Sequence, residues 1–269
     1  MPIVTVKQIL ECLELQPAPS GFTASNLPIE YHRVFGGQVL AQALVAAART
    51  VEDKVPKSLS ATFCREGRPE EPITYDVQVT HDGRAFATRS VTARQDDRVI
   101  AVLTVSLARP ETEHSLDYQI RTAPPGPPER GDIDLVMVPF ESRLANGVDL
   151  GSVASEPPEL VIWMRGCDVP RDEVTQRAVL AYVTNPTLIG TALRALDGVS
   201  VNEAYATTQT AITTHSLWFH RPVDLDGWFV LDQTAPVAAG GQAFGFGHAF
   251  DRSGSHLASY AQESMIRAG

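Results

Sequence analysis

The sequence is poor in cysteine, and its three cysteines do not form a recognisable framework. Cys12, Cys64 and Cys167 are odd in number and lie far apart in a chain of 269 residues. A disulfide scaffold needs paired cysteines, and a structural zinc site usually needs them at CxxC-like spacing. The sequence therefore predicts neither a disulfide framework nor a metal site, and free thiols favour a cytoplasmic location.

Long hydrophobic runs are also missing. A membrane-spanning helix needs about 18 to 20 apolar residues, and no stretch of the chain approaches that length. The apolar N-terminal run, 1–15, is interrupted by Lys7 and Glu11, which is untypical of a signal peptide. We therefore expect no signal peptide, no anchor and no membrane partner.

Positive charge is scarce, with 22 Lys and Arg residues against 32 Asp and Glu, a formal net charge of −10. Because duplex nucleic acid is bound through clustered cations, nucleic acid is not an expected partner. A phosphorylated small ligand would need only a few local cations, for which Arg33, Arg65 and Arg221 are candidates. Hydrophobic residues make up 43% of the chain, enough for one large core or two ordinary ones.

The first half of the chain predicts a buried helix followed by a sheet. A short helix is expected over 3–15 and a loop over 17–28. The segment 38–50 is apolar on nearly every side, so it predicts a helix that is buried all round. Apolar and polar residues then alternate, and Asp82-Gly83 is typical of a hairpin turn. Antiparallel strands are expected near 57–65, 73–81, 85–95 and 98–108, with the helix covering their apolar face.

The same order of elements returns after a proline-rich segment. Residues 110–132 show no periodicity and predict a linker. A strand is expected at 159–165, and a helix from about Asp172 to Asn185, since the residue before Pro186 is disfavoured in a helix. Further strands are expected near 209–220, 227–238, 241–250 and 256–267.

An internal repeat explains this order. Phe63, in Thr62-Phe63-Cys64-Arg65, lies 156 residues before Phe219, in Trp218-Phe219-His220-Arg221. Ile100 lies 157 residues before Leu257, each in a later strand that follows an Asp-Arg pair. The near-constant offset predicts a duplicated unit. We expect an N-terminal unit over 1–109 with a short leading helix, a linker over 110–132 and a C-terminal unit over 133–269.

Three segments resemble the acyl-CoA thioesterase II family: Val34-Phe35-Gly36-Gly37-Gln38, His215-Ser216-Leu217-Trp218-Phe219-His220-Arg221-Pro222, and Gln262-Glu263. The resemblance covers nearly the whole chain in matching order. It implies an α+β fold, a tandem (double) hot-dog in which each antiparallel sheet wraps a long buried helix. It also implies hydrolysis of fatty acyl-CoA to CoA and free fatty acid, with acyl-CoA as the ligand and no cofactor.

In that family three polar residues hold the water that attacks the thioester. The resemblance places the family's glutamine at Gln262, but Asn185 stands at the position of its aspartate and Ile212 at that of its threonine. A neutral amide cannot act as general base, a contribution typically worth about 10² to 10⁴-fold. Thr213 and Thr214 are possible hydroxyl substitutes. On a regular strand Thr213 would face away from the position of Ile212, so only a bulge or register change would bring it there.

Other residues of these motifs are candidates for substrate binding: Phe35, Gly36, Gly37, Gln38, Ile212 and Thr214. Gly36 and Gly37 either bring the N–H groups of a helix start close to a ligand or only let the buried helix enter beneath the sheet. His215 and His220 match no family catalytic position, so packed structural histidines are the favoured interpretation.

Two functions stay open. Catalysis by Asn185, Thr213 and Gln262 would make the protein an acyl-CoA thioesterase. Loss of the base would instead leave an acyl-CoA binding protein with the same pocket. An enoyl-CoA hydratase is disfavoured because no Asp and His pair stands at one helix entrance. Since hot-dog sheets commonly present a face or edge that another copy covers, a homo-oligomer is expected.

Overall fold

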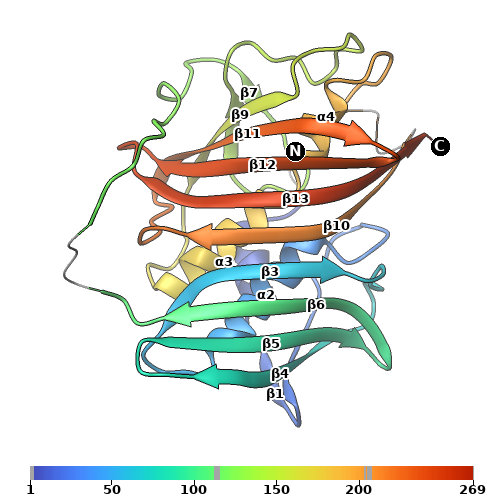
Figure 1. The fold of residues 1–269 in the computed structure, drawn as a ribbon. Helices are drawn as coiled ribbons and strands as arrows, with labels where there is room; N and C mark the ends of the chain where they lie inside the picture. The colour runs from blue at the N-terminus through green and yellow to red at the C-terminus, as the bar shows by residue number, and fades with distance from the viewer. Residues whose placement is uncertain (1–2, 112–115, 203, 205–207, 269) are drawn as a thin grey trace.

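The computed structural model describes residues 3–111, 116–202, 204 and 208–268. The predicted linker lies partly outside the described residues, at 112–115. Within them, one antiparallel sheet of thirteen strands wraps two neighbouring helices, and Figure 1 shows the helices behind the sheet.

The first half of the chain builds one half of the sheet. Its helices are α1 (Val6–Cys12) and α2 (Gly36–Ala48), and its strands are β1 (Gln16–Ala18), β2 (Gly21–Ala24), β3 (Val55–Phe63), β4 (Ile73–Asp82), β5 (Phe86–Gln95) and β6 (Arg98–Ala108). The predicted apolar helix is α2, and every residue from Gly37 to Ala48 is buried. The loop predicted over 17–28 is wrong in part, because β2 and most of β1 form within it. Strands of three and four residues are too short to show a period.

The second half repeats the pattern with additions. Its strands are β7 (Asp132–Ile133), β8 (Glu141–Leu144), β9 (Glu159–Gly166), β10 (Thr208–Phe219), β11 (Gly227–Ala239), β12 (Gln242–Asp251) and β13 (His256–Ala268), and its helices are α3 (Glu173–Thr184) and α4 (Leu188–Leu193). As predicted, α3 starts after Asp172, whose carboxylate accepts from the Thr175 N–H, and ends at Asn185. Neither β7, β8 nor the six-residue α4 was predicted. No helix in the described ranges is long and apolar enough to cross a membrane.

The two halves share one sheet, in the order β1-β2-β4-β5-β6-β3-β10-β13-β12-β11-β9-β8-β7. They join where β3 pairs with β10, with Ser60 opposite Ser216. Beneath this junction α2 packs against α3, and one continuous hydrophobic core contains residues of both helices, including Leu40, Leu44 and Val179. The predicted tandem hot-dog is confirmed, while the domain limits 1–109, 110–132 and 133–269 stay a prediction.

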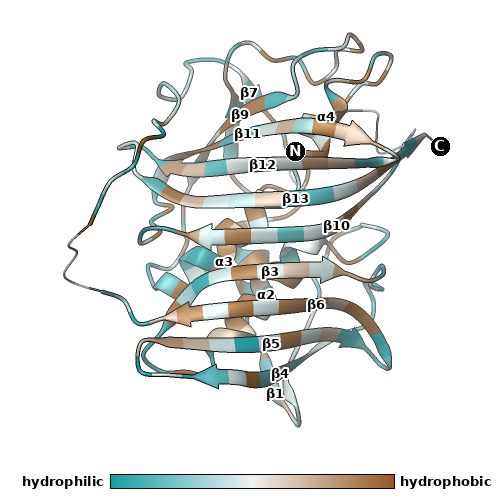
Figure 2. Ribbon diagram, viewed as in Figure 1, coloured by the Kyte–Doolittle hydropathy of each residue, from teal (hydrophilic) through white to brown (hydrophobic). Residues whose placement is uncertain are grey.

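The outer face of the sheet, away from α2 and α3, carries small uncharged side chains. Buried and exposed residues alternate along the central strands, and Figure 2 shows hydrophobic and pale residues alternating there. We call the central part of this face the hydroxyl face. Its fourteen outward residues are Ser58, Ser60, Thr62, Thr88, Ser90, Thr92, Val102, Thr104, Ser106, Thr214, Ser216, Trp218, Ser259 and Ala261.

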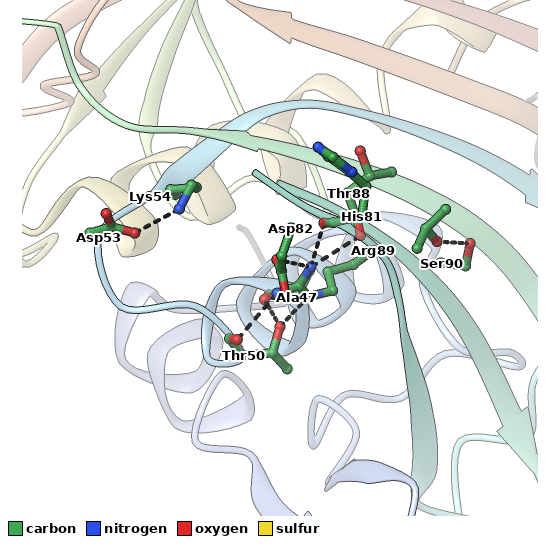
Figure 3. A network of polar contacts seen from close by, with 10 residues as sticks. Ala47, Thr50, Asp53, Lys54, His81, Asp82, Thr88, Arg89 and Ser90 are labelled. Carbon is green, nitrogen blue, oxygen red and sulfur yellow. Dashed lines mark hydrogen bonds and ion pairs between the residues drawn. The ribbon is translucent and has the colours of Figure 1, made fainter. Parts of the chain in front are cut away.

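The carboxyl end of α2 is filled by buried Arg89 of β5 (Figure 3). Its Nε donates to the Thr50 hydroxyl at 2.6 Å, and its Nη1 donates to the His81 carbonyl at 3.1 Å and pairs with Asp82 at 2.8 Å. A cation at this end also suits the negative pole of the helix dipole. Polar contacts within the protein therefore occupy this end of α2, and the opposite end faces a cavity.

Candidate active site

A cavity of about 560 Å³ lies where the start of α2 meets the end of α3, beside β10. Its wall is mainly apolar, formed by residues that include Val34, Phe35, Val39, Phe63, Ile100, Ile133, Leu135, Met137, Val138, Leu150, Leu160, Ile189, Val201 and Ile212. A concave apolar wall with few polar groups is typical of a site for an apolar ligand. The cavity therefore suits an alkyl chain.

Asn185 is the most deeply buried polar residue among those that line this wall. It caps the end of α3 and is fully buried. Among the described residues, neither its Oδ1 nor its Nδ2 has a hydrogen-bond partner. Buried amides are nearly always hydrogen-bonded, because an unmade bond costs about 1–3 kcal/mol. The side chain is therefore available to both a donor and an acceptor of a bound ligand.

The two glycines before α2 have different roles. A Cβ at Gly36 would lie 3.1 Å from Asn185 Oδ1, so the backbone at the helix start lies directly against this amide. A Cβ at Gly37 would lie 2.6 Å from the Tyr182 carbonyl oxygen, in the last turn of α3. Gly37 thus lets the two helices cross closely, whereas Gly36 borders the cavity. Gly37 fits the packing interpretation of the glycine pair, and contact of the Gly36 backbone with a ligand stays a prediction.

A β-bulge in β10 places Thr213 in the cavity wall. Ile212 pairs with Ser264 and Thr214 pairs with Glu263, which leaves Thr213 as the extra residue. Both Ile212 and Thr213 line the cavity, and the Thr213 hydroxyl donates to the Glu263 carbonyl at 3.1 Å. The predicted condition for Thr213 to lie on the same face of the sheet as Ile212 was a bulge, and the bulge is present. A bulge changes the direction of the side chains next to it, so both residues can line the cavity.

Gln262 belongs to a buried polar network behind the cavity wall. His215 Nδ1 lies 3.0 Å from Gln262 Oε1, and His215 Nε2 lies 3.2 Å from the hydroxyl of Thr184, the residue before Asn185. Gln262 Nε2 donates to the Ser264 hydroxyl at 3.0 Å. Ser264 of β13 is the register partner of Ile212 of β10. The Ser264 hydroxyl therefore lies on the neighbouring strand, beside the position where Ile212 replaces the family's threonine.

His215 is neutral in this network. It is fully buried, and burial lowers its pKa to about 4, although the hydrogen bond with Gln262 opposes the shift. The carbonyl oxygen of Gln262 can only accept, so the ring nitrogen Nδ1 carries the proton. Nε2 lies beside the Thr184 hydroxyl, which donates to the Ala181 carbonyl at 3.0 Å. Gln262 thus bonds to His215 through its carbonyl oxygen and to Ser264 through its amide nitrogen.

Five of the predicted site residues line the cavity and four do not. Phe35, Gly36, Asn185, Ile212 and Thr213 form part of its wall, whereas Gly37, Gln38, Thr214 and Gln262 are outside that lining. Gln38 accepts from the Leu27 N–H at 2.9 Å and donates to Asn26, contacts that hold the segment before α2. Thr214 faces the outer side of the sheet.

Sequence reasoning missed Thr184 and Ser264 and assigned His215 a structural role only. Spacing offered no signal for this cluster, because its members come from α3, β10 and β13. Among the candidate phosphate contacts, Arg33 pairs with Glu66 at 2.6 Å and Arg221 with Asp117 at 2.5 Å. Both Arg33 and Arg65 line the cavity. The described residues contain no cluster of His, Cys, Asp or Glu able to hold a metal.

Comparisons with known proteins agree with this geometry. Residues 24–108 match the family model described as acyl-CoA thioesterase N-terminal domain, and residues 148–265 match the acyl-CoA thioesterase model. Acyl-CoA thioesterase 2 of Haemophilus influenzae is 30% identical, over 91% of this chain and 92% of that protein.

Solved structures match along the whole chain. The tesB protein of Mycobacterium avium subsp. paratuberculosis superposes with a TM-score of 0.81 and 28% identity, over 97% of this chain and 99% of that one. An acyl-CoA thioesterase II of Mycobacterium marinum superposes with a TM-score of 0.77 and 31% identity, over 97% of each chain. By its sequence motifs, its fold and these matches, the chain belongs to the acyl-CoA thioesterase II family.

Proposed function

We propose that this protein hydrolyses fatty acyl-CoA to a free fatty acid and CoA. The observation that carries the proposal is the buried, unpaired carboxamide of Asn185 in a mainly apolar cavity. The apolar wall accommodates the acyl chain, and the amide needs the polar partners that a thioester carbonyl and an attacking water supply.

Asn185 acts mainly as a hydrogen-bond donor to the thioester carbonyl and as a group that orients the attacking water. Its Nδ2 and the N–H groups of the first turn of α2 are donors for the oxygen that gains charge in the transition state. Its Oδ1 accepts from the water whose oxygen attacks the thioester carbon. The tetrahedral intermediate then breaks its C–S bond, and CoA leaves as the thiolate and takes up the proton that the water releases.

Thr213 and Gln262 complete the site. Thr213 lies in the cavity wall, and because its hydroxyl donates to the Glu263 carbonyl, its oxygen is proposed to accept a hydrogen bond from the attacking water. Gln262 lies behind the cavity wall and bonds to His215, so its proposed part in catalysis is to position the polar network that reaches Thr184, next to Asn185. No step in this scheme uses a metal or an organic cofactor.

The competing function is acyl-CoA binding without turnover. It is motivated by the neutral Asn185 and by Ile212, which together remove the base and a hydroxyl. A thiol-release assay over acyl-CoAs from acetyl to palmitoyl, run beside calorimetric binding, separates the two. Release above the uncatalysed rate supports hydrolysis. Tight binding without release supports the binding protein, and neither binding nor release contradicts both.

The protein is also proposed to act in the cytoplasm as a homo-oligomer, without nucleic acid or membrane as a partner. Free cysteines and the net charge of −10 support this setting. The outer face of the sheet offers a surface for the oligomer.

A further inference from the structure

A second polar residue of the cavity wall, Thr187, belongs to a network that the hydrolysis scheme above does not use. Thr187 follows Asn185 by two residues, and both line the cavity. It is buried and stands at the N-cap of α4, yet its side chain makes no hydrogen bond to that helix. An N-cap threonine usually bonds to the N–H groups of the first helical turn, so this hydroxyl serves another purpose.

A buried glutamine fixes the hydroxyl oxygen of Thr187. Gln233 of β11 is 1% exposed, and its Nε2 donates to Thr187 Oγ1 at 2.6 Å. The same nitrogen donates to the Tyr260 hydroxyl at 2.7 Å, and Gln233 Oε1 accepts from the Thr191 hydroxyl at 3.0 Å. Both amide hydrogens of Gln233 are thus bonded, and the carboxamide is held from three sides.

A glycine makes room for this network. Tyr260 lies on β13 and Gln233 on β11, with β12 between them (Figure 1). Gly247 of β12 is the register partner of both residues. A Cβ at Gly247 would lie 2.5 Å from the Tyr260 hydroxyl oxygen, so the glycine lets the tyrosine cross β12 and reach Gln233. The packing of three strands therefore fixes the Gln233 carboxamide beside Thr187.

The Thr187 hydroxyl has a hydrogen left to donate. A hydroxyl carries one hydrogen and two lone pairs, and the bond from Gln233 occupies a lone pair. Within the part of the chain that the structure describes, this hydroxyl donates to no protein acceptor. The Asn185 amide in the same wall also lacks partners there. Two such groups in a mainly apolar wall mark the place of a polar atom of the ligand.

We propose that Thr187 is a catalytic residue whose hydroxyl donates a hydrogen bond to the carbonyl oxygen of the bound thioester, beside the Asn185 amide; this inference rests on the proposed hydrolysis. Negative charge develops on that oxygen as water attacks, and a donor already held in place stabilises the charge without reorganisation. Gln233, which fixes the hydroxyl, is a positioning residue. Thr187 keeps its proton throughout, and the C–S bond breaks as described above.

Steady-state thiol release from a fatty acyl-CoA tests the proposal. Thr187→Val keeps the shape of the side chain and removes the donor, so kcat should fall by about 10²-fold. Thr187→Ser keeps the hydroxyl and should retain most of the rate. The matched control Tyr260→Phe removes the other acceptor of Gln233 Nε2, outside the cavity lining. It should lower the free energy of unfolding to a similar extent, with a much smaller loss of kcat.

Binding of two unreactive analogues makes the test independent of hydrolysis. An S-(2-oxoalkyl)-CoA carries a ketone carbonyl near the position of the thioester, whereas an S-alkyl-CoA thioether carries none. In calorimetry, Thr187→Val should bind the ketone about 5-fold more weakly than the wild-type chain does, and the thioether equally well. Thr187→Ala takes the place of Thr187→Val if the valine variant does not fold.

A folded variant without the hydroxyl that binds the ketone as tightly as the wild-type chain overturns the proposal, whether or not acyl-CoA is hydrolysed. Equal losses of kcat in Thr187→Val and Tyr260→Phe also overturn it, because they would give Thr187 a structural role only. Weaker ketone binding in a chain that hydrolyses no acyl-CoA would support the carbonyl contact and contradict the proposed function alone. A wild-type chain that binds neither analogue contradicts both.

Discussion

Asn185 is the residue on which the proposed chemistry depends. A carboxylate at this position could take a proton from water, whereas the amide can only orient it and donate to the carbonyl oxygen. The surrounding structure nevertheless keeps the amide free, since α2 leaves only backbone beside it at Gly36. The structure therefore leaves the polar atoms of the Asn185 amide without partners among the described residues, as the proposed role requires.

Asn185→Asp combined with Ile212→Thr is expected to raise kcat by about 10²-fold, because it adds a base and a second hydroxyl. The rate of the double variant should also fall at low pH, since the new carboxylate must be ionised to act as a base. Steady-state thiol release between pH 5 and 9 measures both effects, with Ile212→Thr alone as the matched control. If the double variant folds but shows no gain in kcat, the attacking water does not lie beside position 185.

His215 is expected to link stability to pH. Its pKa is about 4 in the folded chain and near 6.5 when unfolded, so between these values only the unfolded state binds the proton. Its contribution is fully present above pH 6.5 and is lost as the pH falls toward 4, by up to about 3 kcal/mol. Urea denaturation at pH 7.5 and 5 should show a smaller fall for His215→Gln than for the wild-type chain. Equal falls would contradict a neutral His215.

At the scale of elements, the crossing of α2 and α3 forms the site. Gly37 lets the last turn of α3 approach, and the approach brings Asn185 against Gly36. The bulge in β10 then turns Thr213 into the same space. Local backbone features of three elements, more than any single motif, therefore make the cavity wall.

The two glycines should respond differently to a methyl group. Gly37→Ala meets the Tyr182 carbonyl, so the helices must shift, and the free energy of unfolding should fall by about 1–3 kcal/mol. Gly36→Ala meets only side-chain atoms, so stability should change by less than about 1 kcal/mol. Its methyl group crowds Asn185, however, and kcat/KM should fall by about 10-fold. Urea denaturation and thiol release check the pair, and the reverse order of effects would falsify these roles.

At the scale of the whole molecule, the duplicated chain behaves as one structural unit. The strands of both halves form one sheet, and the core is continuous across the junction of β3 and β10. Residues that complete the site come from both halves, with Gly36 from the first and Asn185 from the second. Neither half could keep its cavity wall without the other.

Unfolding is therefore expected to be a single cooperative transition. All three tryptophans, Trp163, Trp218 and Trp228, lie in the second half, whereas far-ultraviolet circular dichroism reports on both halves. The midpoints in urea from fluorescence and from circular dichroism should coincide. Two separated midpoints would show that the halves unfold independently.

The sequence alone determined the helices α2 and α3, the nine long strands, the repeat and the family. These features depend on local periodicity, on turn residues such as Asp82-Gly83 and on short motifs, all of which can be observed along the chain. It also located Asn185 at a helix end, because Pro186 follows it. The short elements β1, β2, β7, β8 and α4 are below the length at which periodicity is visible.

Only the tertiary structure decided how the site is completed. The pairing of Ile212 with Ser264, the bulge at Thr213 and the contact of His215 with Gln262 depend on the register between β10 and β13. Register is a relation between strands about 50 residues apart, and a shift of one residue would turn each side chain to the other face. For the same reason the hydroxyl face emerges only when five strands are placed side by side.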